Sequence, residues 1–264
     1  MKIVDKLALL LFLVSATSWN VLAQAGPNQT GRFSDLSLKI TSPRESYLLL
    51  EPIPVIFQLR NNTNGPIAGH GSFRFSCSAV EMFVRNPMGQ IQTIRPLSLY
   101  KARCVSKDHN IPPRAQTQYT ELLNLDLNRY FVSTGIYGIQ AVFHSANGPE
   151  LVRSPWLTIS VTQPEGNSLA AYEFLKQGTD LSRVFVRHET EEQRTFFEAF
   201  LANYADSPYS PYIRFNLAEY YMFSGDWDKA KAKLNNLSSV EDFVFASKVA
   251  EMLKGLETKQ KSGK

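Results

Sequence analysis

The chain lacks the short motifs that mark the common hydrolases, nucleotide-binding proteins and zinc proteases. It has no G-x-S-x-G around a serine, no phosphate-cradling glycine loop and no H-E-x-x-H. His70, His109, His144 and His188 are its only histidines, and none stands in a ligand pattern with cysteine or carboxylate. We therefore expect no catalytic residues, no metal and no cofactor, and hence a protein that is not an enzyme.

The chain also lacks a large excess of charge of one sign. The 264 residues include 28 Lys and Arg against 24 Asp and Glu, a formal net charge of +4. A nucleic-acid surface needs basic side chains gathered on one face, whereas here they are scattered along the predicted strands. A nucleic-acid partner is not expected.

Long apolar runs are scarce, and the one at the N-terminus is short. Residues 1–6 carry two lysines, residues 7–16 are apolar, and small residues follow near Ala23 and Ala25. This order is typical of a secretory signal peptide, here residues 1–25. A membrane anchor needs about 20 apolar residues, and no cysteine near the cleavage site offers a lipid attachment point. We expect a periplasmic or secreted protein without stable membrane insertion after cleavage.

Cysteine is nearly absent, with Cys77 and Cys104 the only two. In an exported protein such a pair is more often a disulfide than a reactive couple. On chain-entropy grounds the bridge would stabilise the fold by about 3 to 4 kcal/mol. The alternative is a free thiol with a catalytic role, for which His109 is near in sequence but no orienting third group is recognisable.

The first half of the chain has the pattern of β-strands. Residues 36–40 and 53–60 alternate apolar with polar, and the turn cluster 61–66 follows. Further strands are expected at 73–75, 79–85, 91–94, 117–125, 136–143 and 151–161. Roughly seven short strands separated by turns predict an antiparallel sandwich over residues 26–163. The strings 45–53 and 135–143 resemble immunoglobulin-like modules of extracellular bacterial proteins and macroglobulin-type domains, a resemblance that implies the fold and no function.

The second half has the pattern of helices. Residues 164–168 serve as a linker, and Asn167 or Ser168 is expected to cap a helix that begins at Leu169. Thr190, followed by two glutamates and a glutamine, predicts the start of a helix that runs to about Tyr204. A further helix is expected over 240–256, within a helical domain of residues 169–257, and a disordered tail over 258–264. The acids Glu191, Glu192, Asp226 and Asp228 stand at helix starts, where capping accounts for them.

The segment 211–234 describes two antiparallel helices packed through small residues, with a break at Gly225 and Asp226. Its spacing resembles the tetratricopeptide repeat. Six positions match that repeat: Leu217, Ala218, Tyr221, Gly225, Ala230 and Leu234. Asp242 stands where the closing proline is usual, and the preceding unit is degenerate. The expected fold class is therefore an N-terminal immunoglobulin-like antiparallel β-sandwich followed by an all-α tetratricopeptide-like helical domain.

The repeat resemblance also implies a site. In that family, side chains of the first helix that point away from the second line a concave surface that faces the ligand. Here they are Tyr212, Phe215, Asn216, Glu219, Met222 and Phe223. Aromatic area with an amide and a carboxylate suits a peptide or protein partner in the cell envelope. The alternative is that these residues pack against neighbouring helices or the β domain.

Two other functions stay open on the sequence. The loop 98–113 is long and contains Pro112-Pro113, which would rigidify a segment presented to an extracellular protease, as in an inhibitor or accessory module. Carbohydrate binding by the sandwich would need aromatic residues such as Tyr100, Tyr119 and Tyr130 on one surface.

Overall fold

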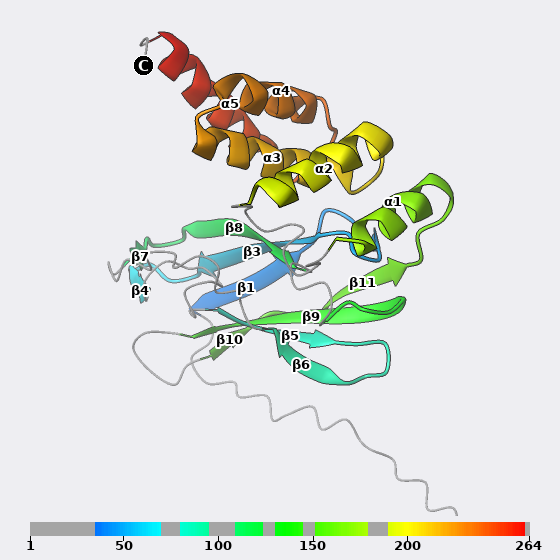
Figure 1. Ribbon diagram of the computed structural model, residues 1–264. Coiled ribbons are helices and arrows are strands. Elements are labelled where there is room, and N and C mark those ends of the chain that lie inside the picture. The colour runs from blue at the N-terminus through cyan, green and yellow to red at the C-terminus, as the bar shows by residue number, and fades with distance from the viewer. Residues whose placement is uncertain are drawn as a thin grey trace, which may run out of the picture. The chain divides into compact units, whose positions relative to one another are not determined.

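The computed structural model describes residues 35–69, 80–94, 109–123, 130–144, 151–178 and 190–261. These residues all belong to one compact unit, Phe33–Lys264, in which strands come first and helices follow (Figure 1). The predicted signal peptide, Cys77, Cys104 and the strand expected at 73–75 lie outside the described residues.

A three-stranded antiparallel sheet is formed by β1 (Leu36–Thr41), β3 (Ile53–Asn61) and β8 (Gln116–Leu123), in the order β1-β3-β8. The alternation seen in the sequence becomes an alternation of burial, because successive side chains of a strand point to opposite faces. Leu36, Leu38 and Ile40 are buried, and the serine and lysine between them are exposed. The strands expected over 36–40 and 53–60 are confirmed.

A second, larger sheet has the order β2-β11-β9-β5-β6, with β10 also paired to β9. Its strands are β2 (Ser46–Leu48), β5 (Val80–Arg85), β6 (Ile91–Ile94), β9 (Gly135–His144), β10 (Leu151–Arg153) and β11 (Leu157–Thr162). Its pairs are antiparallel except that β2 runs parallel to β11. A small two-stranded sheet joins β4 (Ile67–Gly69) to β7 (His109–Ile111).

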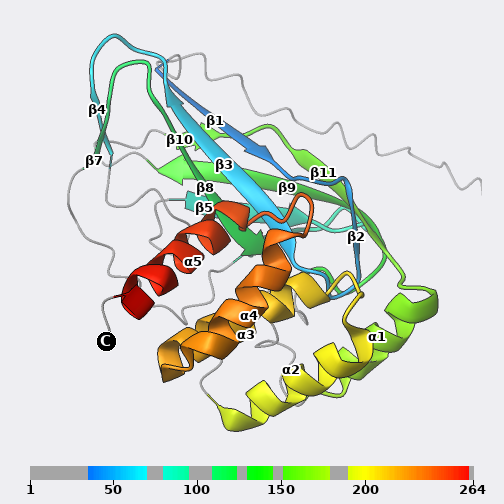
Figure 2. The ribbon, with the colours of Figure 1, turned by 90° about the horizontal axis from the view of Figure 1, so that it is seen from above.

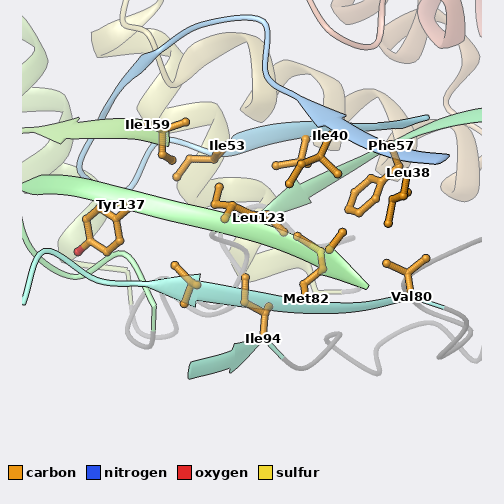
Figure 3. Close-up of a cluster of buried hydrophobic side chains, with 14 of the residues drawn as sticks. Leu38, Ile40, Ile53, Phe57, Val80, Met82, Ile94, Leu123, Tyr137 and Ile159 are labelled. Atoms are coloured by element: carbon orange, nitrogen blue, oxygen red, sulfur yellow. The ribbon is translucent and has the colours of Figure 1, made fainter. Parts of the chain in front are cut away.

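The inner faces of the two large sheets enclose one hydrophobic core (Figure 3). Phe57 from β3, Met82 from β5 and Ile139 from β9 each have 0% of their surface exposed. Such burial is the main favourable term in folding, at about 25 cal/mol per Å² of apolar surface. The inward residues of β9 are therefore the odd-numbered ones, which leaves the even-numbered ones on the outer face of the six-stranded sheet.

Five helices follow the strands: α1 (Gly166–Lys176), α2 (Glu191–Tyr204), α3 (Ser210–Ser224), α4 (Trp227–Ser238) and α5 (Ala246–Lys261). Thr190 caps α2 as expected, since its side chain accepts a hydrogen bond from the backbone N–H of Gln193. Gly225 ends α3 with φ of 82°, and the side chain of Asp226 caps α4. The predicted break between these two helices is confirmed.

Three predicted helix boundaries are wrong. The first helix begins at Gly166, inside the expected linker, and its N-cap is Glu165 rather than Asn167 or Ser168. The last helix begins at Ala246 and not at residue 240, and it ends at Lys261, inside the tail that was expected to be disordered from residue 258. Residues 240–245 form a turn that carries Phe243 and Phe245 into contact with α3, so their apolar character reflects packing and not a helical face.

The helices share their hydrophobic core with a turn of the β region. Leu50, which follows β2, is 7% exposed and belongs to the helical core, and Leu48 and Leu122 pack against it. Tyr209 donates a buried hydrogen bond of 2.8 Å from its hydroxyl to the backbone carbonyl of Leu49. In Figure 2, seen from above, α3 and α4 lie next to one end of β3 and β8.

The expected fold class is therefore wrong in two respects. The larger sheet is mixed and not antiparallel, because β2 pairs in parallel with β11. The helices do not form a separate all-α tetratricopeptide-like domain, since Leu50 completes their core and the described residues form one compact unit. The structure is an α/β fold, with strands in the N-terminal to middle part and helices at the C-terminal end. The physical reason is the turn at Leu50, where φ of 65° turns an apolar side chain toward the helices.

Candidate functional site

The six predicted partner-binding residues lie on α3, but they differ in exposure. Tyr212, Phe215 and Asn216 are buried, with 8%, 6% and 5% of their surfaces exposed. Glu219 and Met222 are half-buried. Phe223 is 73% exposed, at the C-terminal end of the helix. The structure thus presents only the last part of the predicted set to solvent.

The chain itself covers the first part of that set. The ring of Phe215 stacks on Phe245 at 5.1 Å between centroids, and Tyr212 meets Phe243 edge-on at 5.8 Å. Lys248 of α5 lies 4.8 Å from the centroid of the Phe215 ring and donates a hydrogen bond of 2.6 Å to Glu219 Oε1. The turn before α5 and the first turn of α5 therefore occupy the place that the repeat resemblance assigns to a ligand.

The opposite side of α3 carries a polar network that ties three helices together. Glu198 of α2 accepts hydrogen bonds from the hydroxyl of Tyr221 at 2.7 Å and from Lys233 of α4 at 2.6 Å. Partial burial raises the pKa of Glu198, but the bonds from Lys233 and Tyr221 outweigh it and hold this pKa below its usual range. Burial, together with the bond to Glu198, raises the pKa of Tyr221 to about 12. These groups are used in packing the helices.

A second polar cluster holds the turn between β2 and β3. Glu51 is 1% exposed, pairs with the guanidinium of Arg44 and accepts the backbone N–H of Leu48 at 2.9 Å. The same guanidinium lies 4.6 Å from the centroid of the Tyr47 ring. Burial raises the pKa of the Glu51 carboxyl despite Arg44 and the Leu48 N–H. The cluster fixes the turn that carries Leu50 into the helical core.

A third feature was not anticipated from the sequence: a β-bulge in the strand formed by β10 and β11. Arg153 stands opposite Val142 on β9, and Leu157 stands opposite Ile139. Residues 154–156 therefore face only residues 140–141, which is the one-residue excess that defines a bulge. The buried hydroxyl of Ser154 secures it, since it accepts the N–H of Ala141 at 3.0 Å and donates to the carbonyl of Pro155 at 2.8 Å.

The bulge directs Trp156 onto the outer face of the six-stranded sheet. A Cβ atom added to Gly138, an outer-face position of β9, would lie 3.0 Å from Trp156 Cε3 and 3.3 Å from the guanidinium of Arg85. The guanidinium carbon of Arg85 is 4.9 Å from the centroid of the Trp156 ring. A glycine at position 138 thus leaves the space in which the indole and the guanidinium stack against the sheet.

Exposed aliphatic residues flank this stack. Ile91 of β6 is opposite Arg85, which is opposite Gly138, and Ile136 lies two residues before Gly138 on the same face of β9. Ile91 and Ile136 are 58% and 61% exposed. The β5–β6 turn comes close to the start of β9, since a Cβ atom added to Gly135 would lie 2.6 Å from Pro87 Cγ. Met88 in that turn is 82% exposed, and Val132, three residues before Gly135, is 58% exposed. We call the set Arg85, Met88, Ile91, Val132, Ile136 and Trp156 the sheet patch.

The sequence does contain a signal for the bulge. Within 151–161 the inward residues are even-numbered at Val152 and Ser154 and odd-numbered at Leu157, Ile159 and Val161. This change of phase across Pro155-Trp156 marks an extra residue, because strand side chains repeat every two positions. The phase alone does not say which partner strand the bulge faces.

In Figure 1 the labelled helices lie on the side of the three-stranded sheet, away from β5 and β6.

The other predicted sites are only partly described. Of the loop 98–113, the described part begins at residue 109, and His109–Ile111 is the strand β7, followed by the exposed Pro112 and Pro113. Tyr100 lies outside the described residues. Tyr119 is half-buried with its ring stacked on Phe57 at 4.6 Å, and Tyr130 is 7% exposed. Of the two described tyrosines, neither Tyr119 nor Tyr130 offers an exposed aromatic surface.

Within the described ranges no group of three or more His, Cys, Asp and Glu side chains is placed to hold a metal ion. None of the helices described is long and apolar enough to cross a membrane.

Comparison with known proteins gives no relative. No family model and no curated protein matches the chain. The CARDB domain of the PF1109 protein from Pyrococcus furiosus is 12% identical with a TM-score of 0.29, over 49% of this chain and 94% of that one. The C-terminal domain of wzt is 8% identical with a TM-score of 0.34, over 50% and 76%. Spo0M from Bacillus subtilis is 10% identical with a TM-score of 0.31, over 53% and 56%. Likenesses at this level carry no argument about function.

Proposed function

We propose that the protein is a non-catalytic binding protein of the cell envelope, and that the sheet patch contacts a protein or peptide partner. The observation that carries the proposal is where the exposed apolar residues gather. The described residues include six exposed large hydrophobics, Met88, Ile91, Val132, Ile136, Leu169 and Phe223. Four of these six belong to the sheet patch.

Single exposed apolar residues are normal on a soluble protein, whereas gathered ones mark interaction sites. The composition of the sheet patch supports a protein partner in particular. Tryptophan, arginine and methionine are enriched in protein interfaces, and tryptophan and arginine supply much of the binding energy there. An aromatic ring already held against the sheet loses little conformational freedom on binding.

The location in the cell envelope is part of the proposal and rests on the N-terminal sequence alone. The two lysines, the apolar run and the small residues that follow support export. The exposed end of α3, with Met222 and Phe223, is the part of the predicted partner-binding set that a partner reaches, and we assign it a secondary contact.

Photocrosslinking in living cells tests the proposal. A benzophenone amino acid placed at position 88 should give a discrete crosslinked product, and the same probe at Ser37, an exposed position on β1, should not. The product from position 88 should disappear in an Ile136→Asp variant, because a carboxylate in the sheet patch disfavours apolar contact. A product from position 223 but not from position 88 would move the site to α3. Equal yields at positions 37 and 88 would contradict the proposal.

A further inference from the structure

Arg85 occupies an unusual position for a surface arginine. It lies on the outer face of β5, and its described contact is with the ring of Trp156, at 4.9 Å. Within the part of the chain that the structure describes, its guanidinium has no carboxylate partner. Stacking on an aromatic ring leaves the N–H groups at the edge of the guanidinium plane available, in the fork geometry that suits a carboxylate.

The neighbours of Arg85 do not supply a negative charge. Glu81 shares its face of β5 but is four residues away, about 13 Å along a strand. Glu81 is opposite Val142, which is opposite Arg153, so the register places this acid in the same cross-strand row as a different arginine. The outer-face positions closer to Arg85, at Thr93, Gln140 and Thr158, are neutral. The local charge around the indole is therefore positive.

The apolar half of the site is equally well defined. The exposed side chains of Ile91 and Ile136 lie on the same face as the stacked pair. Ile91 is next to Arg85 in the Arg85–Gly138 row, and Ile136 lies two residues away along β9. A ligand that covers Trp156 therefore meets aliphatic surface and a guanidinium edge. Burial of apolar surface supplies affinity in such a site, and the charged contact supplies orientation.

Resting on the proposed function, we infer that the sheet patch recognises a peptide segment of a partner protein in which a carboxylate stands beside a large apolar side chain. Arg85 receives the carboxylate. Trp156, Ile91 and Ile136 receive the apolar group.

An array of synthetic eight-residue peptides tests this with the full-length chain. Each peptide carries a central Glu or Asp next to Leu, Ile, Phe or Trp, and each has a matched peptide with Gln or Asn in place of the acid. Acidic peptides should bind about ten-fold more tightly than their amide matches, the range expected for a charge-assisted hydrogen bond at a surface. Added salt should reduce the difference.

Substitutions in the chain show which residues cause the preference for acidic peptides. Arg85→Gln should abolish the preference for the acid and leave the weaker apolar binding in place. Arg60→Gln, which removes an exposed arginine from β3, should change nothing. Gly138→Ala should weaken binding of both peptide classes, because the added Cβ meets the indole at 3.0 Å. In a ¹⁵N-labelled chain, the indole signal of Trp156 should move on peptide addition, while that of Trp227 in α4 stays in place.

Three results would overturn the inference. Equal affinity for acidic and amide peptides would remove the role of Arg85 and leave the proposed protein binding standing. Preference for the acid that persists in Arg85→Gln would place the carboxylate elsewhere. Absence of binding to every peptide would reject this ligand class, and the crosslinking at position 88 would then decide the proposed function separately.

Discussion

At the scale of single residues, Glu51 is a buried side chain whose charge state affects folding. Its carboxylate is buried, and burial outweighs Arg44 and the Leu48 N–H in setting its pKa, which is raised. A folded state that binds the proton more tightly than the unfolded state is stabilised below the unfolded pKa. That contribution is lost as the pH rises through the raised, folded pKa. Ionised Glu51 therefore costs stability at neutral pH.

We predict that Glu51→Gln unfolds at a higher urea concentration than the wild type at pH 7 and that the gap narrows toward pH 4. An amide keeps an acceptor for Arg44 or the Leu48 N–H without the buried charge. Replacing a whole buried ion pair by neutral side chains is often neutral to stabilising by about 1 to 4 kcal/mol. Here the substitution of Glu51 alone leaves no buried charge, because the Arg44 side chain is 49% exposed and stays in contact with water. The matched control is Glu173→Gln, which removes an exposed carboxylate paired with Lys176 and should show no such dependence on pH. A gap that widens toward low pH would mean that the pairing with Arg44 dominates.

The residues of the sheet patch show what sequence patterns miss at this scale. No sequence pattern assigns a role to Trp156, because its direction depends on the bulge, and Gly138 lies inside the strand expected over 136–143. The roles of both residues follow from the strand register, which brings Arg85 opposite Gly138. The buried Tyr212 and Phe215 show the converse, since both lie on the predicted helix and their covering by Phe243 and Phe245 agrees with the alternative that they pack against other parts of the chain.

At the scale of elements, the glycine that ends α3 and the glycine inside α5 differ in the backbone conformation that their positions require. Gly225 ends α3 at φ of 82°, and Gly255 lies within α5; a Cβ at either position meets nothing within 4 Å. A steric clash therefore contributes to neither alanine substitution, and the two effects on stability come from the backbone conformation at each position. We predict that Gly225→Ala lowers the free energy of unfolding by about 1 to 2 kcal/mol, the cost of a left-handed residue with a side chain.

The same substitution in α5 should act in the other direction. Gly255→Ala should raise the free energy of unfolding by about 0.5 to 1 kcal/mol, because alanine loses less backbone entropy in a helix interior. Urea titrations of the two variants, compared at equal slope, measure both effects. Changes of the same sign would contradict the assignment of these two glycines to a helix end and a helix interior.

Most elements follow from local patterns, because period-two alternation and helix caps are written in adjacent residues. Thr190 and Gly225 marked helix ends correctly, and the strands from 36 and 53 have the expected span. The errors occur where pairing with a strand that is distant in the sequence determines the structure. The short strand β2 exists because β11 offers a parallel edge, and the strand expected over 151–161 divides at the bulge because β9 sets two registers.

At the scale of the whole molecule, the all-α tetratricopeptide-like domain was the main error in the expected fold class. A linker at 164–168 and a change from strand to helix pattern favoured two independent cores. The apolar run before Glu51 reads equally well as strand or turn in the sequence. Only the backbone at Leu50, with φ of 65°, shows that its side chain leaves the sandwich and enters the helical core.

Because Leu50 of the turn between β2 and β3 belongs to the helical core, we predict that the sheets and the helices unfold together. In a chain without residues 1–25 that carries Trp227→Phe, the fluorescence of Trp156 reports the sheets, and circular dichroism at 222 nm reports the helices. Both signals should give the same urea midpoint, the mark of a two-state transition. Tyr209→Phe, which removes the buried bond to the Leu49 carbonyl, should lower both midpoints equally, at a cost of about 1 to 3 kcal/mol for the unpaired carbonyl. Two separate midpoints, or a shift confined to the helical signal, would show that the helices unfold as a unit of their own and that the contact at Leu49 and Leu50 does not couple them to the sheets.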